Sequence, residues 1–97
     1  MRVAVPHNLT RAEARKRINA HMNEMEGFIP GTSSVKGTWE DQDHLALGIG
    51  VMGKEIQAGI DVEDHQIVIE VNLPLSLTLF SSTIKGAIRD RGTKLLT

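Results

Sequence analysis

The fold is decided by one stretch of the chain, residues 44–62, which reads HLALGIGVMGKEIQAGIDV. Apolar residues occupy alternate positions in its first half, and the alternation resumes after Gly53 and Lys54. A period of two residues is typical of a β-strand with one face in the core, and a short interruption of this kind is typical of a tight turn. The stretch therefore predicts two antiparallel strands joined by a hairpin.

The same alternation extends in both directions from this hairpin. The strand before it is separated by a polar turn at residues 40–43 and has three apolar or small residues on one side: Val35, Gly37 and Trp39. The strand after it follows the polar residues 63–65 and has these alternating apolar residues: Ile67, Ile69, Val71 and Leu73. Four consecutive strands with short polar connections indicate an antiparallel meander.

A short strand and a helix are predicted before the meander. Residues 2–6 alternate in polarity, and Pro6 prevents further donation to a sheet ladder. Thr10 and Glu13 have the spacing of a capping box, so a helix is expected to begin at Arg11. Its apolar stripe has a helical period and comprises Ala14, Ile18, Met22 and Met25. The helix is therefore expected to be amphipathic and to pack by one face.

A second helix is predicted after the meander. Gly27 is the expected end of the first helix, and residues 27–34 are read as a turn-rich loop. Pro74 ends the last strand, after which Ser76 or Thr78 is expected to cap a helix. The apolar stripe of this helix comprises Leu77, Phe80, Ile84, Ala87, Ile88 and Leu95.

These elements predict an α+β fold of βαββββα order, in which two amphipathic helices cover one face of an antiparallel sheet. The 97 residues are expected to form a single domain, residues 1–97, with one core. The opposite sheet face would carry small and polar groups: Ala46, Gly48, Gly50, Met52, Gln57, Gly59, Asp61, Val68, Glu70 and Asn72. It is interpreted either as a solvated face or as a face kept low by glycine for another sheet, a second subunit or an extended ligand.

The composition excludes several classes of function. The chain has no cysteine, which excludes disulfides, thiolate nucleophiles, iron–sulfur clusters and cysteine-based zinc sites. The net charge of -1 argues against non-specific nucleic-acid binding. No apolar stretch approaches the ~20 residues that cross a bilayer, and residues 1–6 do not resemble a signal peptide. We therefore expect a cytoplasmic protein without a transmembrane segment.

No group of residues has the spacing of a catalytic, metal or cofactor site. The histidines are scattered and are interpreted as surface or turn residues: His7, His21, His44 and His65. The acidic residues of the meander are interpreted as turn residues: Asp41, Asp43, Asp61, Glu63 and Asp64. The GIGVMG run at residues 48–53 lies within a strand and its turn, not between a strand and a helix, so it does not predict a phosphate-binding loop. We expect no enzymatic activity and no cofactor.

Basic residues gather in one part of each helix. The first helix has Arg11, Arg15 and Arg17 in its first half. The second helix has Arg89, Arg91 and Lys94 in its second half. If the helices run antiparallel, these bases meet at one end of the molecule. Two interpretations stay open: a solvated face with Glu13 paired to Arg17, or a basic patch that attracts an anionic surface or protein.

Several segments together resemble one known family. They are VPHNLTRAEAR at residues 5–15, Ile18, Trp39, the glycine-containing residues 52–60, VNLP at residues 71–74, and Lys94 to Leu96. In this order they resemble the polyhydroxyalkanoic acid system family, small bacterial proteins associated with polyhydroxyalkanoate storage granules. The loop at residues 27–34 departs from the pattern. The resemblance implies an accessory or regulatory role at or near granules, and it carries over no catalytic residue.

Two functions are compared on this basis. The first is a non-enzymatic accessory protein that binds the granule surface or a granule protein through the glycine-rich face (Gly48, Gly50 and Gly59), the basic helix ends, or both. The alternative is a small-ligand domain that encloses an acyl chain, with four candidate lining residues: Trp39, Met22, Met25 and Phe28. A homodimer is a further hypothesis, through pairing of an edge strand such as residues 3–5 or 35–39 across a twofold axis.

Overall fold

The computed structural model describes residues 1–22, 24 and 31–97. Its strands and helices follow in the order β1 (Arg2–Pro6), α1 (Arg11–Ala20), β2 (Thr32–Trp39), β3 (His44–Val51), β4 (Lys54–Val62), β5 (Gln66–Val71), the 3-10 helix η2 (Leu75–Phe80) and α2 (Ser81–Leu96). This is the βαββββα order that the sequence predicts. The 3-10 helix η2 is an addition to it.

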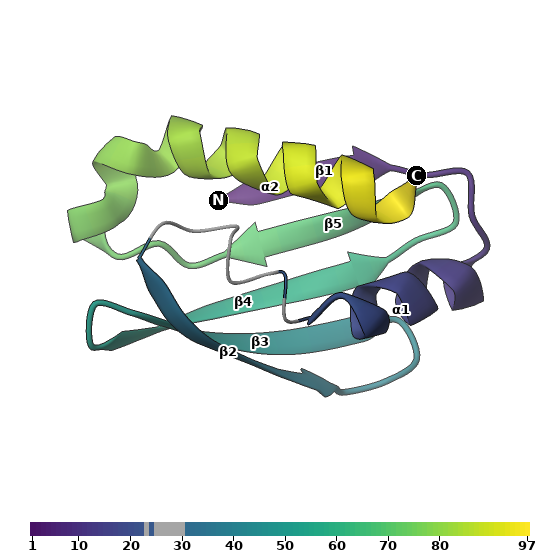
Figure 1. Ribbon diagram of the computed structural model, residues 1–97, viewed down its shortest axis with the longest axis horizontal. Helices are drawn as coiled ribbons and strands as arrows, with labels where there is room; N and C mark the ends of the chain where they lie inside the picture. Colours follow the sequence, from purple (N-terminus) through teal and green to yellow (C-terminus); the bar gives the residue numbers. More distant parts are fainter. Residues whose placement is uncertain (23, 25–30) are drawn as a thin grey trace.

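All five strands form one antiparallel sheet in the order β1-β5-β4-β3-β2 (Figure 1). Both β3 and β5 are antiparallel to β4, so they run in the same direction and end at the same end of the sheet. This end carries the hairpin at residues 52–53 and, after β5, η2; we call it the apolar end. The opposite end carries the turns at residues 40–43 and 63–65 and the link from β1 to α1, and we call it the polar end.

The core lies between one face of the sheet and both helices. A row of residues paired across four strands shows its density: Val3, Ile69, Ile60 and Leu45 are each at most 3% exposed. Both helices contribute to this core through Ala14, Ile18, Ile84, Ile88 and Leu96. The prediction of an α+β fold with two helices on one sheet face is confirmed.

Helix α1 begins as predicted and is shorter than predicted. The Thr10 hydroxyl accepts a hydrogen bond from the Glu13 backbone N–H at 3.1 Å. The α-helix ends at Ala20: the next residue, His21, still donates its backbone N–H to the Arg17 carbonyl, but its φ of -111° and ψ of 20° lie outside the helical range. Met22 therefore lies beyond the α-helix, although it still packs against the core. The predicted positions at Met25 and Gly27 lie outside the described residues. Strand β2 begins at Thr32, so the predicted loop gives way to strand earlier than expected.

The start of the second helix is where the sequence prediction was wrong. Neither Ser76 nor Thr78 caps α2; its N-cap residue is Phe80, which makes no side-chain capping bond. The Thr78 hydroxyl donates instead to the Leu75 carbonyl within η2. Because η2 continues directly into α2, the backbone of η2 occupies the place where a side-chain cap would act. The predicted core residue Phe80 is 56% exposed, since it belongs to this 3-10 segment.

Candidate functional site

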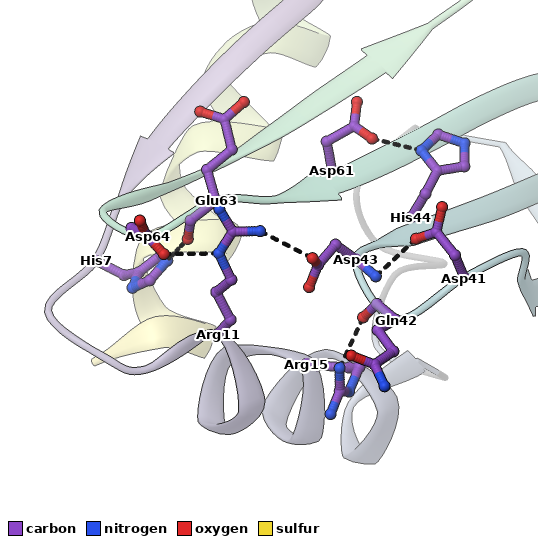
Figure 2. A network of polar contacts seen from close by, with 10 residues as sticks. All are labelled: His7, Arg11, Arg15, Asp41, Gln42, Asp43, His44, Asp61, Glu63 and Asp64. Atoms are coloured by element: carbon purple, nitrogen blue, oxygen red, sulfur yellow. Dashed lines mark hydrogen bonds and ion pairs between the residues drawn. The ribbon is translucent and has the colours of Figure 1, made fainter.

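At the polar end, Arg11 of α1 binds two turns of the sheet (Figure 2). Its Nε lies 2.7 Å from Oδ1 of Asp64, and its Nη1 lies 2.8 Å from Oδ2 of Asp43. The hydrogen bond to Asp64 is the main reason why the Arg11 pKa is raised, and the same bond lowers the Asp64 pKa. One exposed side chain therefore ties the start of α1 to the β2–β3 and β4–β5 turns.

Two further residues of the 5–15 segment support the same attachment, at intervals of four residues. His7 is 6% exposed; its Nδ1 accepts from the Leu9 N–H at 3.1 Å, so its Nε2 donates to the Glu63 carbonyl at 2.9 Å. Arg15 donates from Nη1 to the Gln42 carbonyl at 2.8 Å. Of the two interpretations of His7, a surface residue or a turn residue, the first is wrong: His7 is buried, and it anchors the link between β1 and α1. The segment that carries the family resemblance has a structural role here.

His44 lies between two carboxylates on the sheet face away from the helices. Its Nδ1 is hydrogen-bonded to Asp61, and its Nε2 is 3.1 Å from Oε1 of Glu40. The hydrogen bond to Asp61 raises the His44 pKa above its ordinary value, and the nearby negative charges act in the same direction. The arrangement is an ion-pair cluster when His44 is protonated. A shallow, open depression of about 560 Å³ borders this cluster and is lined by His44, Asp61 and residues of the two neighbouring turns.

The three glycines of the same sheet face are overlaid by neighbouring side chains. A Cβ at Gly48 would lie 2.9 Å from a Glu55 carboxylate oxygen, and one at Gly50 would lie 2.6 Å from the Ser34 hydroxyl. A Cβ at Gly59 would lie 3.2 Å from the His44 ring. These glycines therefore make room for side chains of the same sheet. Their use by a partner stays a prediction.

The six predicted basic residues divide into separate groups. Arg17, Arg91 and Lys94 line one groove of about 360 Å³ between the last turns of α1 and α2. Within it, Arg17 binds Glu13 at 3.3 Å and the main-chain oxygen of Thr97 at 2.9 Å.

The other three predicted bases lie elsewhere. Arg11 and Arg15 are occupied at the polar end, and Arg89 is exposed on α2 outside the residues that line the groove. Three of the six basic residues that were predicted to meet at one end of the molecule therefore lie together in this groove.

The candidate lining residues of an acyl-chain site are only partly described. Trp39 is half-buried, and its indole N–H donates to Oδ1 of the Asn19 side chain at 3.4 Å. Met22 lies against Gly37, where its sulfur is 2.6 Å from the place that a Cβ would occupy. Met22 thus fills space between α1 and β2 as a packing residue. Met25 and Phe28 lie outside the described residues, so the acyl-chain site stays a prediction.

The apolar end has the feature that sequence reasoning missed. Leu75 is 90% exposed, Leu79 is 91% exposed and Phe80 is 56% exposed, all in η2. Met52, at the tip of the β3–β4 hairpin, is 77% exposed. Residues 71–89 contain no aspartate or glutamate. The available signal for this exposed segment was the pair Leu75 and Leu79, which lie outside the predicted helical stripe that includes Leu77 and Phe80.

The structure places this protein in the class of small two-layer α+β proteins. Its most conspicuous surface feature is the exposed apolar end. Within residues 1–22, 24 and 31–97, no group of three or more potential ligands could hold a metal ion. In the same part of the chain, no helix is long and apolar enough to cross a membrane.

Residues 1–96 match the family model described as polyhydroxyalkanoic acid system protein. The chain belongs to this family, and the resemblance inferred from its segments is confirmed. Comparison with curated proteins gave no match, and comparison with solved structures gave none either.

Proposed function

We propose that this protein is a non-enzymatic, cytoplasmic accessory component of polyhydroxyalkanoate storage that attaches to the granule surface through its apolar end. The observation that carries the proposal is the exposure of Leu75, Leu79 and Phe80 on one short segment. Large apolar side chains that are exposed together on one short segment are typical of a site of contact with another apolar surface. A granule offers such a surface, because its polymer is an uncharged polyester.

The position of these side chains supports the proposal. They lie in η2, which protrudes at one end of the long axis of the molecule and comes after the last strand (Figure 1). None of the residues of η2 is buried in the core. Transfer of one such side chain from water to an apolar phase is worth roughly 1.5–3 kcal/mol. Insertion of these side chains into the polymer surface would favour reversible attachment.

Co-sedimentation with amorphous polyhydroxyalkanoate granules tests the proposal, with phospholipid vesicles as a second surface and salt added in steps. The test variant carries Leu75→Ser, Leu79→Ser and Phe80→Ser. The control variant carries Ala12→Ser and Ala20→Ser, which change exposed apolar residues on α1. We expect salt-resistant binding of the wild type and the control, and a loss of at least tenfold in the test variant.

Three other results would contradict the proposal in different ways. Equal binding of the test variant and the wild type would exclude η2 as the contact. Binding to granules and vesicles that salt abolishes would favour the basic groove of Arg17, Arg91 and Lys94. Absence of binding to protein-free granules, together with binding to granules that retain their proteins, would favour a granule protein as the partner.

A further inference from the structure

The residue at the tip of the β3–β4 hairpin is unusual for its backbone conformation. Val51 pairs with Lys54, so the loop consists of Met52 and Gly53 alone. Both have positive φ, 53° and 76° respectively. Two-residue hairpin loops of this kind favour asparagine, aspartate or glycine at the first position, because these residues adopt the left-handed region at little cost. A methionine there is unfavourable for the fold.

The side chain of Met52 gives no packing reason for this choice. It is 77% exposed and does not belong to the core, whereas its neighbour Val51 is 2% exposed. Within the part of the chain that the structure describes, the Cγ and Cε atoms of Met52 lie 4.0 Å from the place that a Cβ on Gly31 would occupy, so this mostly exposed side chain gains little from the fold. Residues held in costly backbone conformations are often kept for contacts that the isolated protein does not make.

The sheet topology places this hairpin beside the proposed attachment segment. Strand β3 leads into the hairpin and β5 leads into η2, and both strands end at the same end of the sheet. In Figure 1 the hairpin and η2 form the same extremity of the long axis. One surface that meets this extremity can therefore contact both.

The charges near the hairpin are compatible with an apolar phase. Lys54 follows the hairpin loop directly, and its long side chain can bury its methylene groups and keep the ammonium group in water. The carboxylate of Glu55, in the same hairpin, is turned back along the sheet, where it lies over Gly48 and accepts from Gln57 at 2.8 Å. The other carboxylates of the meander turns lie at the polar end, around Arg11 and His44.

We infer that Met52 is a second insertion point, and that the protein meets the polyester surface end-on, through the hairpin tip and η2 together. This inference rests on the proposed attachment through η2 and adds a residue and an orientation to it. Contact at two separate elements fixes the long axis of the molecule toward the surface. Contact through η2 alone would leave the molecule free to lie on its side.

The affinity test uses two substitutions that separate apolarity from backbone strain. Met52→Asn suits the left-handed turn and removes the apolar side chain, whereas Met52→Leu keeps an apolar side chain at the same strained position. In titrations with protein-free polyester granules, we expect Met52→Asn to raise Kd about five- to tenfold and Met52→Leu to change it by less than about twofold. Equal Kd values for Met52→Asn and the wild type would refute the inference.

Orientation is measured separately with an environment-sensitive fluorophore on a cysteine. The chain has no cysteine of its own, so Met52→Cys and Lys36→Cys each give one labelling site. We expect a blue shift on granule binding for the label at position 52 and none for the label at position 36 in the middle of β2. No shift at position 52, with binding intact, refutes end-on contact and leaves the proposed attachment through η2 standing. No binding by the wild type removes both.

Discussion

Arg11 is exposed, yet its side chain connects α1 to two turns that are distant in the sequence. The bond to Asp64 lowers the pKa of that carboxyl group, so the bond stabilises the fold fully above the ordinary carboxylate pKa of 3.8. This contribution disappears as the pH falls through the lowered pKa of the folded state. Its loss is therefore confined to strongly acidic conditions.

Arg11→Ala tests this linkage. We expect the Asp64 pKa, measured by NMR titration, to rise toward its ordinary value in the variant. We also expect the urea midpoint to be lower than that of the wild type at neutral pH, and the two midpoints to converge below the wild-type Asp64 pKa. An Asp64 pKa that is unchanged in the variant would mean that Arg11 is not its main partner.

His44 predicts a pH dependence of the opposite sign. Its folded-state pKa is raised by Asp61, so the stabilisation is fully present below the ordinary histidine pKa of 6.5. It is lost as the pH rises through the raised pKa. The titrating group faces Asp61 and Glu40 and stacks over Gly59, and these are the contacts that change.

The measurement is the urea midpoint of the wild type and of His44→Gln between pH 5.5 and pH 9. We expect the wild type to be more stable than the variant at pH 5.5 and the difference to shrink as the pH rises. Direct observation of the His44 ring by NMR gives the pKa itself. A ring pKa at or below 6.5 would contradict the expectation.

Two glycines of α2 differ in the room that their surroundings leave for a larger side chain. A Cβ at Gly86 would have no neighbour within 4 Å, whereas a Cβ at Gly92 would lie 3.1 Å from Cγ2 of Val5. Alanine is favoured over glycine inside a helix by about 1 kcal/mol. The gain is available in full only where no neighbour must move.

We therefore expect Gly86→Ala to raise the free energy of unfolding by about 0.5–1 kcal/mol. Gly92→Ala should give a smaller gain or a loss, because α2 must move away from β1 to admit the new methyl group. Urea denaturation of both variants measures the difference directly. A larger gain at Gly92 than at Gly86 would show that the contact with Val5 relaxes without cost.

The elements that could be predicted from the sequence are those whose apolar residues recur with the period of one buried face. The meander could be predicted because Leu45, Leu47, Ile49 and Val51 alternate without interruption, and all four are buried. The start of α1 could be predicted because Thr10 has a local partner three residues away. The segment η2 could not, because its leucines alternate as in a strand while their backbone forms a 3-10 helix after Pro74.

The functional residues were harder to predict than the elements. The ion pairs of Arg11 with Asp43 and Asp64 join residues far apart in the chain, and they require the strand register and the position of α1 together. His44 and Asp61 meet because they are directly opposite each other on β3 and β4. The contact between His44 and Asp61 could therefore be predicted once the pairing of β3 with β4 was assigned. The exposure of Leu75 was not, since it depends on the path of the chain after β5.

In the part of the chain that the structure describes, one core cluster joins both helices with the strands β1, β3, β4 and β5, and Val35 and Trp39 of β2 pack against it. We propose that residues 1–97 unfold as one cooperative unit, as small domains with a single core usually do. Ile60 is 1% exposed in the central strand β4, so Ile60→Ala should lower the free energy of unfolding by about 2–4 kcal/mol.

Trp39 is the only tryptophan, and it reports on the β2 edge while far-UV circular dichroism reports on the whole fold. We expect the two probes to give the same urea midpoint for the wild type and for Ile60→Ala. A Trp39 transition at lower urea concentration would show that the β2 edge opens separately from the rest of the sheet.

The exposed thioether of Met52 has a chemical consequence. Of the methionines that the structure describes, Met1 and Met22 are half-buried and Met52 is exposed, so mild peroxide should reach Met52 first. Oxidation to the sulfoxide makes the side chain polar without demanding room in the core, and sulfoxide reductases reverse it. The hairpin tip is thus a position where a redox change would alter the surface of this protein and leave its fold intact.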